Sequence, residues 1–83
     1  MAPLRVKLFA GLREAAGTDL FEWEAPAGST VADLRTELRS RFPQAAALAA
    51  RSFVAVDREY AVDSKVLEEA SEIAFIPPGS GGA

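Results

Sequence analysis

The last eight residues of this 83-residue chain form the one segment whose residue types suggest chemistry. They are Ile76, Pro77, Pro78, Gly79, Ser80, Gly81, Gly82 and Ala83. Proline fixes φ and removes a backbone donor, so the proline pair should hold the chain stiff and extended. Glycine offers no side chain to bury, so we expect residues 79–83 to form a flexible tail. Such a thin chain end can enter a narrow active site and present a carboxylate there.

Composition excludes most other chemistry. The chain has no cysteine and no histidine, which removes disulfides, thiolate nucleophiles, nearly all transition-metal sites and the usual general base near neutral pH. We therefore expect no catalytic residue, no metal site and no bound cofactor, and no enzyme activity of the chain alone. Glu68 and Glu69 are adjacent carboxylates, but neighbouring side chains diverge in a strand or helix, so they should be solvated.

The charge balance limits the partners. The net charge is −3 and no extended basic cluster occurs, which argues against nucleic-acid binding through phosphate contacts. No segment approaches the ~20 apolar residues of a membrane span, and residues 1–7 lack the apolar core of a secretion signal. The absence of cysteine suits a reducing compartment. We expect a soluble cytoplasmic protein with no membrane partner.

The first third of the chain predicts two strands. Residues 4–10 alternate between apolar and charged positions, which indicates a half-buried strand. Phe9 lies on the charged face of this strand, where it is either a packing residue, a lone exposed aromatic or a docking contact. Residues 11–17 predict a connector with one helical turn that ends at Gly17 in the left-handed conformation. Residues 20–25 predict a second strand, antiparallel to the first, with Trp23 in the core.

A helix should follow. Val31, Leu34, Leu38 and Phe42 recur at helical spacing. Thr30 is a good N-cap, with Asp33 in the position of a capping-box acid. Pro43 should end this helix, and the alanine-rich residues 44–51 should form a short helix or a tight turn.

The last strand fixes the topology. Residues 53–56 and 60–62 predict a third and a short fourth strand, and residues 71–76 predict the last. In that last strand Ile73 and Phe75 point one way and Ala74 and Ile76 the other, so both faces are apolar and the strand should be central, beside the first. The expected fold is α+β: a β-grasp (ubiquitin-like) fold, with a mixed four- to five-stranded sheet and one main helix across one face. Residues 1–78 would form this domain and residues 79–83 the tail.

Three stretches resemble a known family. They are residues 6–17 (VKLFAGLREAAG), residues 30–34 (TVADL) and residues 72–82 (EIAFIPPGSGG). Together they resemble the small subunit of molybdopterin synthase, within the ubiquitin-like sulfur carriers. The sequence departs from the common family pattern at Asp57, at residues 70–71, at Gly79 and at Ala83.

The resemblance implies a reaction sequence for the tail. A ubiquitin-activating-type adenylyltransferase would use ATP and magnesium to adenylate the carboxylate of Gly82, and a sulfur donor would convert it to a thiocarboxylate. The segment from Pro77 to Gly82 would then enter the large subunit of molybdopterin synthase and give its sulfur to a pterin precursor. The candidate contacts of the body with these partners are Phe9, Phe75 or Ile76, and residues of the open face of the sheet, and the sequence does not fix which of them face outward. Ala83 would block the chemistry, so it is either removed by a protease, which we favour, or slows activation, or is an artefact.

Other functions stay open at this stage. The chain could carry sulfur for thiazole or cysteine synthesis, or be a ubiquitin-like modifier conjugated to lysines. It could also be a binding module that uses only its sheet face, in which case Gly-Ser-Gly-Gly would be a plain flexible terminus.

Overall fold

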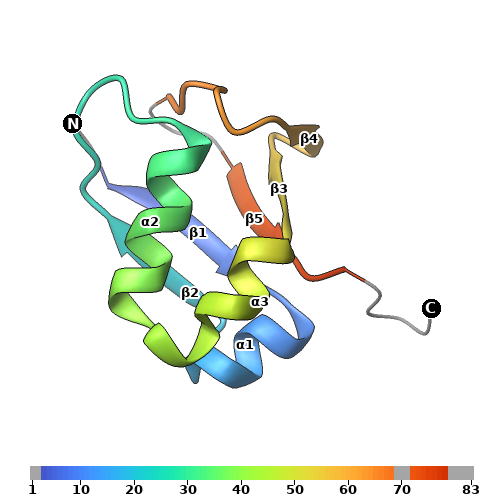
Figure 1. Cartoon of the computed structure of the whole chain (residues 1–83). Helices are drawn as coiled ribbons and strands as arrows, with labels where there is room; N and C mark the ends of the chain where they lie inside the picture. Colours follow the sequence, from blue (N-terminus) through green and yellow to red (C-terminus); the bar gives the residue numbers. More distant parts are fainter. Residues whose placement is uncertain (1–2, 69–71, 79–83) are drawn as a thin grey trace.

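The computed structural model describes residues 3–68 and 72–78. Five strands form one sheet in the order β2-β1-β5-β3-β4 (Figure 1). The strands are β1 (Leu4–Leu8), β2 (Leu20–Trp23), β3 (Phe53–Val56), β4 (Glu59–Ala61) and β5 (Glu72–Ile76). The helical elements are α1 (Ala10–Ala16), α2 (Val31–Arg41), the 3₁₀ turn η1 (Pro43–Ala45) and α3 (Ala46–Arg51).

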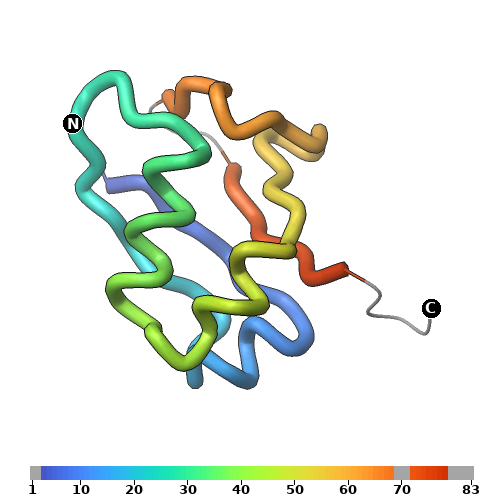
Figure 2. The backbone as a smooth tube through the Cα atoms, viewed as in Figure 1, coloured from blue at the N-terminus to red at the C-terminus, as the bar shows by residue number. Residues whose placement is uncertain are grey.

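The first and last strands of the chain, β1 and β5, are neighbours in the middle of the sheet. β5 lies between β1 and β3, parallel to β1 and antiparallel to β3, and Figure 2 shows the first and last strands running side by side. The register places Val6 opposite Ile73 and Leu8 opposite Phe75. This confirms the predicted central position of the last strand, and with it the predicted α+β class with a mixed sheet.

One face of the sheet is covered by helices, and the other is open (Figure 1). The largest fully buried side chains come from both layers and are Phe75, Leu4, Leu8, Leu12, Leu34, Leu38, Ile73, Val6, Val31 and Val54. Trp23 is also buried, as predicted. The covering layer holds α1 and α3 in addition to the one main helix that was expected, α2.

The sequence signals for α2 are confirmed. The hydroxyl of Thr30 accepts a hydrogen bond from the Asp33 N–H, and the Asp33 carboxylate accepts one from the Thr30 N–H. These bonds satisfy amides that have no partner within the helix. The helix ends at Arg41, just before Phe42 and Pro43, as the proline predicts.

The predicted strand ends differ from the structure where the backbone takes a positive φ. β1 ends at Leu8, not at residue 10, because Ala10 has φ 49° and already begins α1. β3 and β4 are joined by Asp57 (φ 53°) and Arg58 (φ 70°), the two left-handed residues of a tight hairpin turn. Ladder pairing therefore resumes at Glu59, one residue earlier than predicted.

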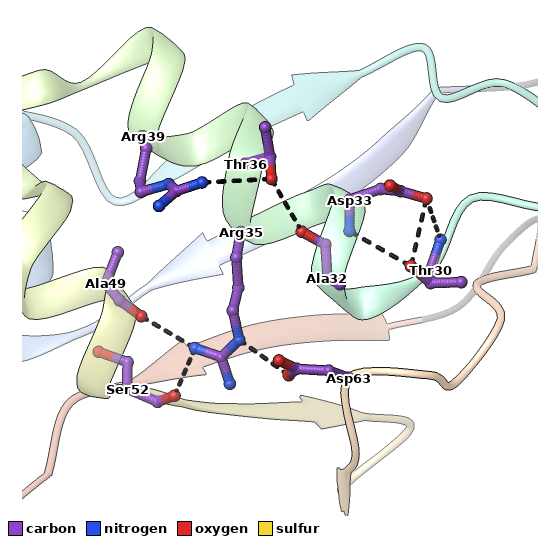
Figure 3. A network of polar contacts seen from close by, with 9 residues as sticks. All are labelled: Thr30, Ala32, Asp33, Arg35, Thr36, Arg39, Ala49, Ser52 and Asp63. Carbon is purple, nitrogen blue, oxygen red and sulfur yellow. Dashed lines mark hydrogen bonds and ion pairs between the residues drawn. The ribbon is translucent and has the colours of Figure 1, made fainter.

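Arg35 ties three parts of the fold together (Figure 3). From α2 its Nη1 donates to the carbonyls of Ala49 at 2.9 Å and Ser52 at 2.8 Å, and its Nε donates to Asp63 Oδ1 at 3.0 Å. The guanidinium also lies 5.9 Å from the centre of the Phe75 ring. Arg35 thus fixes the junction between α3 and β3 against the main helix.

Replacing Arg35 with methionine is expected to lower the free energy of unfolding by about 2–3 kcal/mol, because two partly buried carbonyls lose a charged donor. Chemical denaturation followed by circular dichroism measures this. Arg39→Met is the matched control, since among residues 3–68 and 72–78 the Arg39 side chain has a single hydrogen bond, to the exposed Thr36 hydroxyl at 3.5 Å. Equal losses in the two variants would show that Arg35 contributes no more than an ordinary surface arginine.

Candidate functional site at the exit of the last strand

The chain leaves the body at the end of β5, between the ends of two other strands. Ile76 pairs with Phe53, the first residue of β3. On the other side Phe75 pairs with Leu8, so Phe9 follows directly beside the exit. Pro77 is buried and Pro78 is half-buried. The body therefore holds the chain as far as the second proline, and the exit point is defined.

An apolar patch surrounds this exit on the open face of the sheet. Phe9 is 46% exposed and Phe53 is 50% exposed, and Ile76 is half-buried between them. The ring of Tyr60 stacks on Phe53 with a centroid distance of 5.4 Å. We call Phe9, Phe53, Tyr60 and Ile76 the exit patch. Exposed aromatic groups gathered in this way are typical of surfaces that bind protein partners.

Small side chains make the face hollow next to the patch. Ala55 and Ala74 lie opposite each other on neighbouring strands. Together with Phe9 and Ile76 they line a hollow of about 210 Å³. A protruding apolar side chain of a partner could fill this hollow without disturbing the sheet.

Charged side chains lie on the same open face, and Lys7, Arg58 and Glu72 border the hollow itself. Arg5 pairs with Glu22 at 3.8 Å, and Glu72 lies within 3.8 Å of Lys7 and 3.6 Å of Arg58. All these side chains are exposed, so the ion pairs contribute little to stability. Charges placed beside an apolar patch instead help to orient a partner.

Two of the three predicted body contacts lie at the exit, and the third does not. Phe9 and Ile76 both line the open face. The prediction that Phe75 belongs to the partner surface is wrong, because its side chain is 0% exposed. Strand alternation turns Phe75 toward the helices and Ile76 toward solvent.

Sequence reasoning missed Phe53 and Tyr60. The register of the β3–β4 hairpin sets Tyr60 opposite Ala55, on the same face as Phe53. A two-residue turn at Asp57 and Arg58 implies this pairing, so the turn length was the signal that could have placed both rings on the open face.

The predicted tail and its predicted thiocarboxylate site lie outside the described residues. This applies to Gly79, Ser80, Gly81, Gly82 and Ala83, and also to Glu69 and residues 70–71. Within residues 3–68 and 72–78, no group of three or more acidic side chains is arranged to hold a metal ion. No helix in that part of the chain has the length and apolar character needed to cross a membrane.

The fold agrees with the comparisons with known proteins. The ThiS family pattern matches residues 6–82. The chain belongs to the ThiS family. This confirms the resemblance to ubiquitin-like sulfur carriers that the sequence stretches indicated.

Particular relatives come from plants and algae. The molybdopterin synthase sulfur carrier subunit of Arabidopsis thaliana is 35% identical over 79 residues, which cover 95% of this chain and 82% of the relative. The subunit of the same name from Chlamydomonas reinhardtii is 31% identical over 81 residues, covering 95% and 98%. The chain is therefore homologous to sulfur carrier subunits of molybdopterin synthase.

Solved structures support the same fold. Small archaeal modifier protein 1 from Haloferax volcanii has a TM-score of 0.84 at 26% identity, covering 96% of this chain and 99% of its own. A Pyrococcus furiosus protein described as molybdopterin converting factor subunit 1 also has a TM-score of 0.84, at 28% identity, covering 94% and 99%.

Proposed function

We propose that this chain is the sulfur-carrying small subunit of a molybdopterin synthase. The observation that supports the proposal is the position where β5 ends: Ile76 lies between Phe9 and Phe53, inside an exposed apolar patch. The family match includes the segment that follows, as far as Gly82. The homology to two sulfur carrier subunits of this synthase favours this pathway. The partner that follows from the homology is the large subunit.

The chemistry proposed for Gly82 has two steps. Its carboxylate attacks the α-phosphorus of ATP on an activating enzyme, pyrophosphate leaves, and an acyl-adenylate forms. Sulfide, supplied by a sulfur donor, then attacks the acyl carbon as HS⁻, AMP leaves, the proton is lost to water, and a thiocarboxylate remains. ATP and magnesium are thus used by the partner, and the chain supplies only the acyl group. Removal of Ala83 must come first, because a peptide bond cannot be adenylated in this way.

The geometry of the body suits this role. The four residues from Gly79 to Gly82 reach about 13–14 Å when extended, so the reactive carboxylate can enter a partner while the body stays outside. Ordering this segment costs about 1–2 kcal/mol per residue. Burial of the exit patch would offset that cost, since Phe9 and Phe53 are exposed apolar groups beside the exit.

Intact-mass measurement tests the proposal. The chain ending at Gly82 is incubated with an activating enzyme, ATP, magnesium and a sulfide source, and we expect it to gain the mass difference between sulfur and oxygen. The chain that keeps Ala83 is the control and should stay unchanged. Formation of molybdopterin after addition of a large subunit identifies the pathway. A chain ending at Gly82 that stays unmodified by an activating enzyme competent on its own carrier would contradict the proposal.

A second candidate function is that of a ubiquitin-like protein modifier, which the structural similarity to small archaeal modifier protein 1 favours. In that role the carboxylate of Gly82 would form amide bonds with lysines of other proteins. Tagged chain expressed in its own cells would then yield covalent conjugates that survive denaturation. Carriage of sulfur for thiazole or cysteine synthesis would instead give loading without molybdopterin formation.

A further inference from the structure

The sheet has two edges, and β2 forms the longer one. The Leu8 N–H donates to the Asp19 carbonyl at 2.9 Å, which sets the alternation of the antiparallel β1–β2 ladder. Phe21, opposite Val6, therefore directs its backbone groups toward β1. The N–H and C=O groups of Leu20 and Glu22 consequently point away from the sheet. Such a row is a template for pairing with another strand.

Side chains form hydrogen bonds with most of these outward backbone groups. The Thr18 hydroxyl donates to the Leu20 carbonyl at 2.9 Å and accepts from the Leu20 N–H at 3.4 Å. Arg41 Nη1 donates to the Glu22 carbonyl at 2.7 Å. Within the part of the chain that the structure describes, the Glu22 N–H is the one outward group of β2 for which no hydrogen bond is found.

Arg41 is held firmly in this position. Its Nε donates to Glu37 Oε2 at 2.7 Å, one turn earlier on α2. Its guanidinium lies 5.0 Å from the centre of the Phe21 ring, and Phe42 packs edge-on against the same ring at 5.7 Å. The last turn of α2 therefore reaches over the edge of the sheet and covers it.

We propose that Thr18 and Arg41 close the β2 edge against a second copy of this chain. Two β2 strands can pair antiparallel about Phe21, so that Leu20 of each copy lies opposite Glu22 of the other and four hydrogen bonds form. The charge of Glu22 does not prevent this, because Arg5 lies 3.8 Å away. With the edge closed, the protein stays monomeric. This inference does not depend on the proposed function.

The test uses the full chain with Thr18→Val and Arg41→Met together. We expect the self-association constant, measured by sedimentation equilibrium, to rise by at least about tenfold, because two backbone carbonyls lose their donors. Arg39→Met removes the same charge from an exposed position of α2 and should leave the constant unchanged. If the double variant is poorly folded, the same measurement is made on each single variant, for which we expect a smaller rise in the self-association constant.

Hydrogen exchange at Glu22 identifies the surface that associates. Its N–H points outward in the monomer, so it should exchange rapidly there and become protected once β2 strands pair. Folded variants that associate no more than the unmodified chain would overturn the proposal. Association without protection of the Glu22 amide would overturn it as well, because the copies would then meet through another face.

Discussion

A chain that ends at Gly81 is expected to lose at least about 99% of the rate of sulfur loading that the chain ending at Gly82 shows. Deleting one residue withdraws the reactive carboxylate by about 3.5 Å. A misplacement of about 1 Å can already cost a hundredfold in rate. The loss should appear without any change in stability, since the buried core described by the structure runs from Leu4 to Phe75. Loading is measured as the thiocarboxylated fraction against time by mass spectrometry.

Ser80→Ala in the chain ending at Gly82 is the control for this deletion. It alters the tail and keeps its length, so loading should stay within a few-fold of the unmodified rate. Full loading of the chain ending at Gly81 would show that the carboxylate of Gly82 is not the reactive group. It would show that the activating enzyme accepts a terminal carboxylate one residue closer to the body.

The central part of the fold could be predicted because its signals are local and repeated. The alternation around Val6 and the two apolar faces of β5 gave a central pair of strands, and both the register and the burial agree. The bounds of α2 were predicted correctly from Thr30, Asp33 and Pro43. Helix capping and the helix-breaking effect of proline both act within a few residues.

What the sequence left undecided depends on contacts between distant segments. The sequence left Phe9 open between packing and exposure. Its backbone is extended (φ −121°, ψ 156°), so the alternation of β1 continues through Phe9, and its side chain is 46% exposed. No pattern in the sequence indicates the left-handed alanine that follows, Ala10 with φ 49°. The partner contact assigned to Phe75 failed for a related reason. Because both faces of the central strand are apolar, the sequence does not reveal which of the two faces the helices cover.

Arg35 and Arg41 show the same limit. Both lie on α2, and the i,i+4 spacing of Glu37 and Arg41 by itself places that ion pair on one side of the helix. Their hydrogen bonds to the carbonyls of Ser52 and Glu22 join residues 17 and 19 positions apart. Long side chains find such carbonyls only after the layers have packed, so helical spacing alone cannot reveal them.

The second large effect concerns binding of the exit patch to a protein partner. Phe9→Asp is expected to weaken binding to the large synthase subunit by about 30- to 1,000-fold, which corresponds to the 2–4 kcal/mol of a central aromatic contact. A carboxylate at this position would be buried against an apolar partner surface without a counter-ion. Isothermal titration calorimetry with the separate large subunit measures the change. The melting temperature should stay close to that of the unmodified chain, because Phe9 is already 46% exposed.

Val66→Asp is the matched control for Phe9→Asp, because Val66 is also 46% exposed and bridges to Thr30 at the start of α2, away from the exit. Its affinity should stay within about twofold, since exposed substitutions outside an interface change free energies by less than ~0.5 kcal/mol. Equal losses in both variants would point to charge, not to the exit patch. An unchanged affinity of Phe9→Asp would place the partner elsewhere and leave burial of the tail as the main source of binding energy.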